Sequence, residues 1–395
     1  MNDAHAIRNP AGLPPGSWLG MLGGGQLGRM AAHAAQQLGY RMAVLDPDLN
    51  SPAGAAADEH LCAPYEEPRA LQQLAQLCAA VSTEFENVPA RVMEKLAAER
   101  FVAPSAAALA VCQDRAAEKA HFARSGVPCA PHAVLSTAAD CAGVSEALLP
   151  GILKTATLGY DGKGQRRVAS REQLQAAFAE LGGVRCVLEQ LLPLAAEISV
   201  VLARGRDGAI SLLPVQRNWH EDGILATTVA PAAGVSVALC RQAQAHARAI
   251  AAAFDYVGVL CIEFFVLEDG RLLANEMAPR PHNSAHHSID SCSASQFELQ
   301  VRALAGLPLP EVRQHSAAVM LNLLGDLWFD AEDRQREPDW AAVLAFSGAH
   351  LHLYGKAEPR RARKMGHLTL TAATPEAAAA LARQAARALG LPCHA

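Results

Sequence analysis

The segment "VLCIEFFVLEDGRLLANEMAPR", at 259–280, restricts the fold of this chain more than any other feature. Asp269-Gly270 stands between two runs of strand-forming residues, and this dipeptide is typical of a two-residue β-hairpin turn. In the register that such a turn sets, Glu263 lies directly opposite Glu276. The same alternation places four more residues on that face: Cys261, Phe265, Leu272 and Ala274. The sequence therefore predicts an antiparallel sheet with two facing carboxylates.

Two carboxylates on an apolar face repel each other, and each is costly to bury without compensation. A neighbouring lysine or arginine, or a raised pKa, is one way to compensate them. A divalent cation is another, because hard oxygen ligands on a rigid pair of strands suit Mg²⁺ that bridges phosphates. We therefore predict that Glu263 and Glu276 are metal ligands.

A glycine-rich stretch, "KTATLGYDGKGQ", occupies 154–165. Gly159, Gly162 and Gly164 follow Lys154 closely, and a flexible loop of this kind can close over a polyphosphate with its backbone N–H groups as donors. The order of residues differs from the Walker A pattern, so the stretch is not a P-loop. Taken alone, the glycines are also compatible with an ordinary surface turn.

The region 17–100 alternates short apolar runs with helical patterns. Strands are predicted at 17–22, 41–46 and 79–85. Helices are predicted from Gln26, near 67–79 and from Pro89. This alternation indicates a parallel α/β layer.

The first loop of that layer, "LGMLGGGQLGRM", contains G-x-G-x-x-G at Gly23, Gly25 and Gly28. Asp46 closes the next apolar run, 18 residues after Gly28 (46 − 28). Glycine turn, helix, strand and acidic residue together make up nearly the whole dinucleotide-binding fingerprint. By itself this loop predicts a phosphate-binding turn in front of a helix N-terminus.

Composition excludes several classes of protein. The chain has 395 residues, enough for several domains, and its net charge of −5 argues against a nucleic-acid-binding surface. No uninterrupted apolar stretch reaches the length of a membrane span, and 1–16 lacks the apolar core of a secretory signal, so we expect a disordered leader there. Ten cysteines without any C-x-x-C indicate buried thiols in a reducing cytoplasm.

Eight segments in their order along the chain resemble one family. They are "GGGQLGRM", "TEFENVP", "QDRAAEK", "GYDGKGQ", "EQLL", "DGILATT", "NEMAPRPHNSAH" and "LYGKAEPRRARKMGH". Together they resemble the ATP-grasp superfamily and, within it, the 5-(carboxyamino)imidazole ribonucleotide synthases. These are ATP-dependent carboxylases of purine biosynthesis, and the resemblance covers residues 17 to about 370.

The resemblance implies the binding residues for ATP and Mg²⁺. ATP would be bound by Arg115, Lys154, the loop Gly159, Tyr160, Asp161, Gly162, Lys163, Gly164 and Gln165, the segment Glu189, Gln190, Leu191 and Leu192, and by Glu197, His220 and Asn275. Mg²⁺ would lie on Glu263 and Glu276, the pair already indicated by the hairpin register.

The resemblance also implies the residues for the other two substrates. Bicarbonate and the carboxyphosphate made from it would face Arg280, His282 and Asn283, and Asp161 or His282 would accept the amine proton. Aminoimidazole ribonucleotide would contact Gly25, Gln26, Leu27, Glu84, Glu86, Asn87 and Tyr160, with its phosphate on Lys356 and Arg363. In this interpretation Asp46 is only a turn residue before Pro47.

The implied fold is α/β and α+β, with the ATP-grasp architecture. We expect a leader at 1–16, a Rossmann-like, biotin-carboxylase-like substrate domain at 17–112, a glycine-lid subdomain at 113–199, a central antiparallel metal and nucleotide domain at 200–316, and a small C-terminal domain at 317–395. The family resemblance also implies a cytoplasmic homodimer without nucleic-acid or membrane partners.

Four alternatives remain at this stage. A nicotinamide-dependent oxidoreductase would use the first glycine loop but leave the facing glutamates and Lys154 unexplained. A non-catalytic nucleotide-binding protein with a decayed site conflicts with the presence of Lys154, Arg280 and both glutamates. A formate-dependent glycinamide ribonucleotide formyltransferase shares the first loop and the lid. His282, His286 and His287 also allow a zinc site, although their spacing is not diagnostic.

Overall fold

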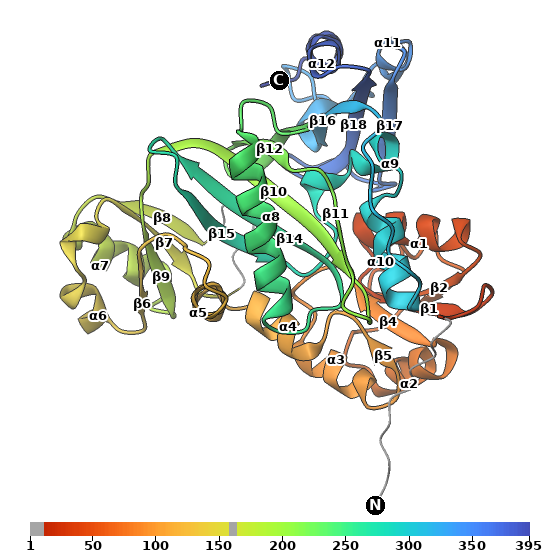
Figure 1. The fold of residues 1–395 in the computed structure, drawn as a ribbon, viewed down its shortest axis with the longest axis horizontal. Helices are drawn as coiled ribbons and strands as arrows, with labels where there is room; N and C mark the ends of the chain where they lie inside the picture. Colours follow the sequence, from red (N-terminus) through yellow and green to blue (C-terminus); the bar gives the residue numbers. More distant parts are fainter. Residues whose placement is uncertain (1–11, 158–163) are drawn as a thin grey trace, which may run out of the picture.

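The computed structural model describes residues 12–157 and 164–395, which form three sheets with helices packed around them (Figure 1). This arrangement, with a parallel N-terminal layer and antiparallel sheets after it, confirms the predicted mixture of α/β and α+β structure. In the part of the chain that is described, no helix is both long and apolar enough to cross a bilayer. All ten cysteines are described, and all are free thiols.

The N-terminal sheet is parallel, with the strand order β3-β2-β1-β4-β5. Its strands are β1 (Trp18–Leu22), β2 (Arg41–Leu45), β3 (Glu59–Leu61), β4 (Ala80–Thr83) and β5 (Phe101–Val102). Its helices are α1 (Gln26–Gln37), α2 (Pro68–Leu77), α3 (Ala90–Ala97) and α4 (Ala106–Cys112). The predicted elements of this layer are confirmed, and Pro89 caps α3 instead of lying inside its first turn.

A small antiparallel sheet, β6-β9-β7-β8, projects from the rest of the molecule at the left of Figure 1. The elements of this lid region are α5 (Arg115–Arg124), β6 (His132–Leu135), α6 (Ala138–Gly143), η1 (Glu146–Leu148), β7 (Gly151–Thr155), β8 (Gln165–Val168), α7 (Arg171–Glu180) and β9 (Cys186–Gln190). The expected glycine loop connects β7 to β8. Its residues 158–163 lie outside the described part of the chain.

The largest sheet has the order β15-β14-β10-β12-β13-β16-β18-β17, with β11 paired to β10. Its strands are β10 (Leu194–Arg204), β11 (Ile210–Leu212), β12 (Gln216–Glu221), β13 (Ile224–Ala230), β14 (Gly258–Leu267), β15 (Leu272–Ala278), β16 (Ala317–Leu324), β17 (Ala349–Leu353) and β18 (Lys364–Ala372). Because β13 pairs with β16, the C-terminal strands extend the central sheet.

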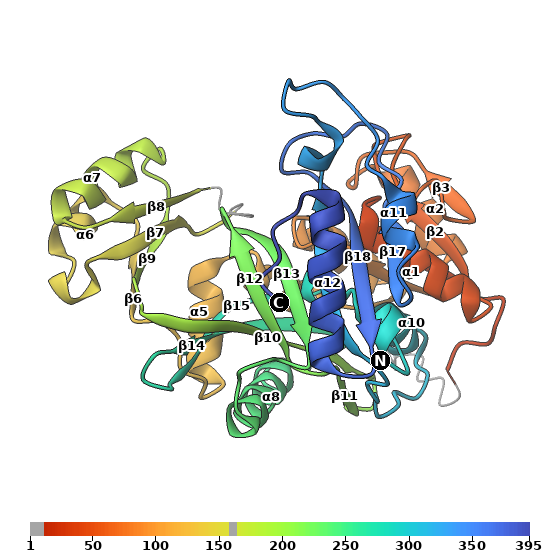
Figure 2. The same cartoon turned by 90° about the horizontal axis from the view of Figure 1, so that it is seen from above.

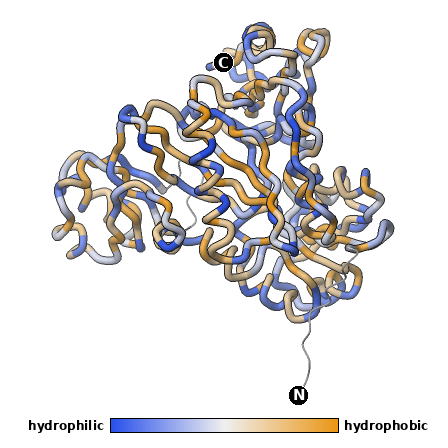
Figure 3. Tube along the Cα trace, viewed as in Figure 1, coloured by the Kyte–Doolittle hydropathy of each residue, from blue (hydrophilic) through white to orange (hydrophobic). Residues whose placement is uncertain are grey.

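Helices cover this sheet on both faces. They are α8 (Val237–Ala252), η2 (Asn283–Ala285), α9 (Ser288–Ser291), α10 (Gln296–Ala305), η3 (Gly325–Trp328), α11 (Trp340–Leu344) and α12 (Pro375–Leu389). Helix α8 packs on β10 and β14 through alanines and Ile250, and α12 packs on β16 and β18 (Figure 2). Figure 3 shows hydrophobic residues along the strands between these helices.

The hairpin of β14 and β15 has the predicted pair but not the predicted turn. Glu263 lies opposite Glu276, as expected. The turn has three residues, because the amide of Leu267 bonds the carbonyl of Arg271 and Gly270 has a φ of 84°. A bulge at Asn275 then shifts the register back by one residue. The turn prediction was therefore wrong, and the pairing was right because the bulge compensates for the longer turn.

The bulge also changes which residues share the face of the two glutamates. Ala274 pairs with Phe264 and Leu272 with Val266, and both lie in the core beneath α8. Leu273, the partner of Phe265, takes the place expected for Ala274. The prediction that Leu272 and Ala274 lie beside the glutamates was wrong, because the alternation of β15 breaks at the inserted residue.

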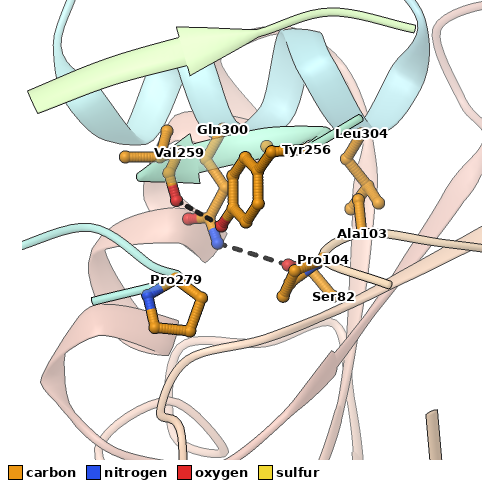
Figure 4. Close-up of a pocket in the computed structure, with 9 residues that line it drawn as sticks. Ser82, Ala103, Pro104, Tyr256, Val259, Pro279, Gln300 and Leu304 are labelled. Carbon is orange, nitrogen blue, oxygen red and sulfur yellow. Dashed lines mark hydrogen bonds between the residues drawn. The ribbon is translucent and has the colours of Figure 1, made fainter. Parts of the chain in front are cut away.

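A small pocket lies where the N-terminal sheet meets the large sheet (Figure 4). The amide of Gln300 on α10 donates to Ser82 on β4 at 3.3 Å, and the hydroxyl of Tyr256 donates to the carbonyl of Val259 at 2.6 Å. The pocket has no space for a water molecule. It is a packing contact that joins two domains and does not offer room for a ligand.

Candidate active site

A cleft of about 590 Å³ lies between the N-terminal loops, the lid and the large sheet. It brings together most of the predicted site residues, from segments far apart in the sequence. Those that line it are Gln26, Leu27, Glu84, Glu86, Asn87, Arg115, Lys154, Gln165, Leu191, Glu197, His220, Glu263, Asn275, Glu276, Arg280, His282 and Asn283.

Other predicted site residues do not line this cleft or cannot be placed. Gly25, Gly164, Glu189, Gln190, Leu192, Lys356 and Arg363 are described and lie outside its wall. Gly159, Tyr160, Asp161, Gly162 and Lys163 lie outside the described residues.

The two facing glutamates have different partners. Glu276 Oε2 lies 3.0 Å from Nη1 of Arg115, whereas Glu263 Oε1 lies 3.3 Å from Nε2 of His282. Desolvation opposes the ionisation of Glu276, but Arg115 and Lys154 outweigh it and lower its pKa. For Glu263, burial and the charge of Glu276 both raise the pKa. The protein therefore compensates the negative charge of Glu276 more fully than that of Glu263.

The surroundings of this pair fit a magnesium ion. Both groups are hard oxygen donors on adjacent strands. The buried Oδ1 of Asn275, in the bulge of β15, has no hydrogen-bond partner among the described residues. An unsatisfied buried oxygen is costly, and a cation or an ordered water would satisfy it. The donor set and the incompletely compensated charge of Glu263 thus match the predicted metal site.

Helix α5 fixes the backbone on both sides of Glu276. The buried ammonium of Lys119 donates to the carbonyl of Asn275 at 2.6 Å, and Glu118 accepts from the amide of Met277 at 2.6 Å. Burial raises the pKa of Glu118 to about 7, although Lys119 and Arg115 act in the opposite direction. These contacts hold the bulge, and so the carboxylate, in place.

Lys119 and Lys154 also share the carboxylate of Glu189. Their ammonium groups lie 3.2 Å from Oε1 and 3.0 Å from Oε2. Desolvation opposes the ionisation of Glu189, but the two lysines outweigh it and lower its pKa to about 2. The buried carboxylate of Glu189 thus holds the ammonium groups of Lys119 and Lys154 in place at the lid.

Sequence reasoning missed Lys119, although "QDRAAEK" carried a signal for it. Lys119 lies four residues after Arg115, and residues at this spacing share one face of a helix. Arg167 on β8 and Gln113 before α5 also line the cleft and were not predicted. Gln113 begins the same segment, "QDRAAEK", whereas nothing in the sequence context of Arg167 distinguishes it from other surface residues.

The lid strands place Gln165 beside Lys154. The two residues pair directly across β7 and β8, and Thr155 bonds the carbonyl of Gly164 at 3.0 Å. The Leu191 amide bonds the carbonyl of Pro150 at 2.9 Å, so that donor is already used. Lys154 and Gln165, at the end of the predicted glycine loop, therefore lie side by side in the cleft wall.

His220 and Glu197 form an ion pair on β12 and β10, with Nδ1 3.0 Å from Oε2. Burial alone would lower the pKa of His220. The hydrogen bond with Glu197 and the charges of Glu263 and Glu197 outweigh burial and raise it to about 9. The imidazole is therefore a cation at neutral pH in the half of the cleft that carries the carboxylates.

Arg280 pairs with Glu86 through two nitrogen–oxygen contacts, one of them 3.0 Å long between Nη2 and Oε1. This bidentate pair joins β15 to the N-terminal domain across the cleft. In the same cleft, both side-chain polar atoms of Asn283 are buried and have no partner within the described ranges 12–157 and 164–395. Arg280 and Asn283 together offer a positive charge and unsatisfied polar atoms to a small anion.

His282 is a weak candidate for the proton acceptor. Burial, Arg280 and Lys364 lower its pKa to about 3, far from the pH at which a general base works best. Its Nδ1 lies 2.9 Å from the hydroxyl of Ser284. Asp161, the other candidate from the sequence, lies outside the described residues.

The first glycine loop binds a carboxylate of the protein itself. The amides of Gly25 and Gly28, at the N-terminus of α1, donate to Glu84, the second at 2.8 Å. A Cβ at Gly23, Gly24 or Gly25 would come within 2.4 Å of a neighbouring side-chain atom, so glycine is required there. The prediction that these amides form a phosphate-binding turn is therefore corrected, because Glu84 already occupies them.

Asp46 has a structural role that sequence reasoning did not give it. Its Oδ2 accepts from the amide of Gly24 at 2.7 Å and from the hydroxyl of Tyr65 at 2.6 Å. It is buried at the end of β2 and fixes the start of the glycine loop. Asp46 is therefore more than a turn residue. Gln26 and Leu27, which begin α1 directly after the glycine loop, line the cleft as predicted.

In the C-terminal region, Lys364 lines the cleft whereas Lys356 and Arg363 do not. The ammonium of Lys356 donates to the carbonyl of Lys364 at 2.7 Å, and Arg363 donates to the carbonyl of Glu358 at 2.7 Å. Lys356 therefore lies directly behind the cleft wall. The zinc alternative is not supported, since His282, His286 and His287 do not form a metal-ligating group among the described residues.

Comparisons with known protein families agree with this architecture. Residues 17–113 match a ribonucleotide synthetase preATP-grasp domain, and residues 120–297 match an ATP-grasp domain. Residues 318–381 match a phosphoribosylaminoimidazole carboxylase C-terminal domain. The predicted ATP-grasp fold is thereby confirmed.

Individual relatives share most of the chain. An N5-carboxyaminoimidazole ribonucleotide synthase of Brucella melitensis is 45% identical over 360 residues, which cover 90% of this chain and 97% of that protein. The chain belongs to the N5-carboxyaminoimidazole ribonucleotide synthases.

Solved structures of N5-carboxyaminoimidazole ribonucleotide synthases are similar over their whole length. The synthetase from Thermus thermophilus is 39% identical with a TM-score of 0.85, and 93% of this chain covers 98% of that one. The synthase from Aspergillus clavatus, in complex with ADP and 5-aminoimidazole ribonucleotide, is 34% identical with a TM-score of 0.85, and 95% of this chain covers 99% of that one.

Proposed function

We propose that this chain is an ATP-dependent ligase that carboxylates the exocyclic amine of 5-aminoimidazole ribonucleotide in purine biosynthesis. One observation carries the proposal: the facing Glu263 and Glu276 share a cleft with the lid lysine Lys154 and with loops of the N-terminal domain. Membership of the synthase family supports it, as does the relative solved with ADP and the ribonucleotide.

Bicarbonate is the proposed source of the carboxyl group. It is a poor electrophile, so ATP first phosphorylates it to carboxyphosphate, a transfer that depends on positioning and charge neutralisation. Lys154 and Arg115 supply positive charge on the lid side of the cleft. When bound on Glu263 and Glu276, Mg²⁺ would supply further neutralisation of phosphate charge.

The second step is attack of the ribonucleotide amine on carboxyphosphate, or on CO₂ released from it, to give a carbamate. Arg280 and Asn283 are the proposed site for the small anion, because a guanidinium can bind two oxygens at once. The low pKa of His282 favours Asp161 as the acceptor of the amine proton. The lid would exclude water, which otherwise hydrolyses carboxyphosphate.

The domains divide this work. We propose that 17–112 holds the ribonucleotide, 113–199 closes over ATP, 200–316 carries the metal and nucleotide site, and 317–395 contributes the phosphate contacts. We also propose, from the family resemblance, that the enzyme is a cytoplasmic homodimer.

A phosphate-release assay with Mg²⁺-ATP tests the proposed function. Release should require both aminoimidazole ribonucleotide and bicarbonate, and labelled bicarbonate should appear in the product. A requirement for formate and glycinamide ribonucleotide would instead identify the formyltransferase alternative. Tight NADH binding without ATP hydrolysis would identify an oxidoreductase.

A further inference from the structure

A second group of potential metal ligands lies outside the proposed active site, where α9 packs against β17 and β18 (Figure 1). It consists of Asp290 on α9, His352 on β17 and His367 on β18. One ligand atom from each lies within 4.8 Å of the other two. His352 and His367 are direct partners across the two strands, so both imidazoles are on the same face of the sheet.

The contacts around His367 leave one nitrogen available. The imidazole is completely buried, and its Nδ1 lies 3.0 Å from the hydroxyl of Tyr354. Its Nε2 has no hydrogen-bond partner in the part of the chain that the structure describes. Histidine ligands of metals commonly have one ring nitrogen held by an outer partner and the other directed at the metal. Tyr354 is placed as such an outer partner.

Asp290 completes the donor set. Its Oδ2 lies 2.9 Å from Nε2 of His352, and its Oδ1 lies 3.6 Å from Nδ1 of His350. Without a cation, the carboxylate pairs with these imidazoles, and Nε2 of His367 is left unsatisfied in the interior. A metal ion among the three groups would satisfy all of them.

We propose that Asp290, His352 and His367 bind a divalent transition-metal ion of the zinc type. Two imidazoles and one carboxylate favour such an ion over Mg²⁺, which prefers oxygen ligands only. Around zinc, ligand atoms about 2.0–2.1 Å from the ion lie about 3.3 Å apart. The three ligand atoms here all lie within 4.8 Å of one another.

The ion would join two parts of the chain. Asp290 follows the segment that carries Arg280 and Asn283, whereas His367 lies three residues after Lys364, which lines the cleft. A bound ion would therefore fix the C-terminal hairpin against the centre of the molecule. It would stabilise the folded state without taking part in the reaction.

Titration of the chelator-treated full chain with Zn²⁺ tests this site, with excess Mg²⁺ present to occupy oxygen-only sites. Isothermal calorimetry should show one Zn²⁺ bound per chain, and Co²⁺ should give the intense visible absorption of a low-symmetry, nitrogen-containing site. Zn²⁺ should also raise the melting temperature of the unliganded protein.

Two variants and one control identify the ligands. His352→Gln and Asp290→Asn change partly exposed side chains, so both should fold, and each should weaken Zn²⁺ binding at least tenfold. His394→Gln is the matched control, because His394 pairs with Glu221 at 2.8 Å on the surface without a third ligand. It should bind Zn²⁺ like the parent. Absence of binding at micromolar Zn²⁺, or equal binding by all four proteins, would overturn the proposal.

Discussion

Two groups of carboxylates border the same cleft and differ in what compensates them. Glu84 accepts hydrogen bonds from two backbone amides at the N-terminus of α1, where the helix dipole favours negative charge. Glu263 and Glu276 face each other, and only Glu276 has a guanidinium partner. Glu84 is thus held by backbone amides of the protein itself, although burial still raises its pKa, whereas two facing carboxylates with one guanidinium partner between them are suited to bind a cation.

The largest expected effect is the loss of turnover in Glu276→Gln. Removing one of the two charges from the pair should reduce kcat by at least about a thousandfold, because charge neutralisation dominates phosphoryl transfer. Steady-state phosphate release measures the loss, and circular dichroism checks that the variant folds. Glu268→Gln, in the exposed turn of the same hairpin, is the control and should retain full activity. A near-normal kcat in Glu276→Gln would contradict the proposal that Glu263 and Glu276 bind the metal ion.

Glu84→Gln should lower the free energy of unfolding more than Glu276→Gln does. It replaces one of the two oxygens that accept from Gly25 and Gly28 with an NH₂ donor and leaves a buried amide without its acceptor, which should lower the free energy of unfolding by about 2 kcal/mol. Urea denaturation measures the difference. Glu67→Gln is the matched control, since Glu67 caps α2 through the amide of Ala70 at a half-buried site, and the decrease in its free energy of unfolding should be smaller. Equal decreases in the free energy of unfolding of the two variants would show that the burial of Glu84 does not increase the contribution of its hydrogen bonds to stability.

Lys356→Ala should raise the KM for the ribonucleotide about tenfold with little change in kcat, because a cation near the phosphate is lost. Lys356 also bonds the carbonyl of Lys364, so part of the effect would pass through that cleft residue. Initial rates at varied ribonucleotide concentration separate KM from kcat. Arg360→Ala, on the same exposed loop, should leave both constants unchanged. An unchanged KM in Lys356→Ala would exclude this lysine from ribonucleotide binding.

The smallest effect is expected in the pH dependence of stability. The pKa of His220 is about 9 in the folded protein, above its ordinary value of 6.5. Its ion pair with Glu197 therefore stabilises the fold fully below pH 6.5, and this contribution disappears as pH rises through 9. The difference in urea midpoint between the parent and His220→Gln should be largest at pH 6 and absent near pH 10. A difference in urea midpoint that stays constant with pH would contradict an ion pair between protonated His220 and Glu197.

Much of the fold could be predicted from local patterns. The strands and helices of the N-terminal layer, the long α8 and the alanine-rich α12 follow from periodicity and capping residues. The pairing of Glu263 with Glu276 was also predicted, but through a wrong turn whose error the bulge at Asn275 cancels. A bulge depends on contacts from elsewhere, in this case the bond from Lys119 on α5, and so leaves little trace in the local sequence.

The candidate site was less predictable where its residues act on one another. The pairing of Arg280 with Glu86 joins positions 194 residues apart. The contacts of Glu189 with Lys119 and Lys154 join β9 to helix α5 and to strand β7. Neither pairing has a spacing that the sequence reveals. The positions of Lys364 in the cleft wall and Lys356 behind it also depend on how β18 packs.

By itself, the sequence determined the element types, the family and the kinds of side chain available for chemistry, because these depend on local composition and order. Only the tertiary structure decided which charges from distant segments meet. Gly25 and Gly28 belong to a dinucleotide-type pattern in the sequence, yet in the fold their amides donate to Glu84, which directly follows β4. Electrostatic compensation acts over a few ångströms in space, and the chain brings those groups together only when it folds.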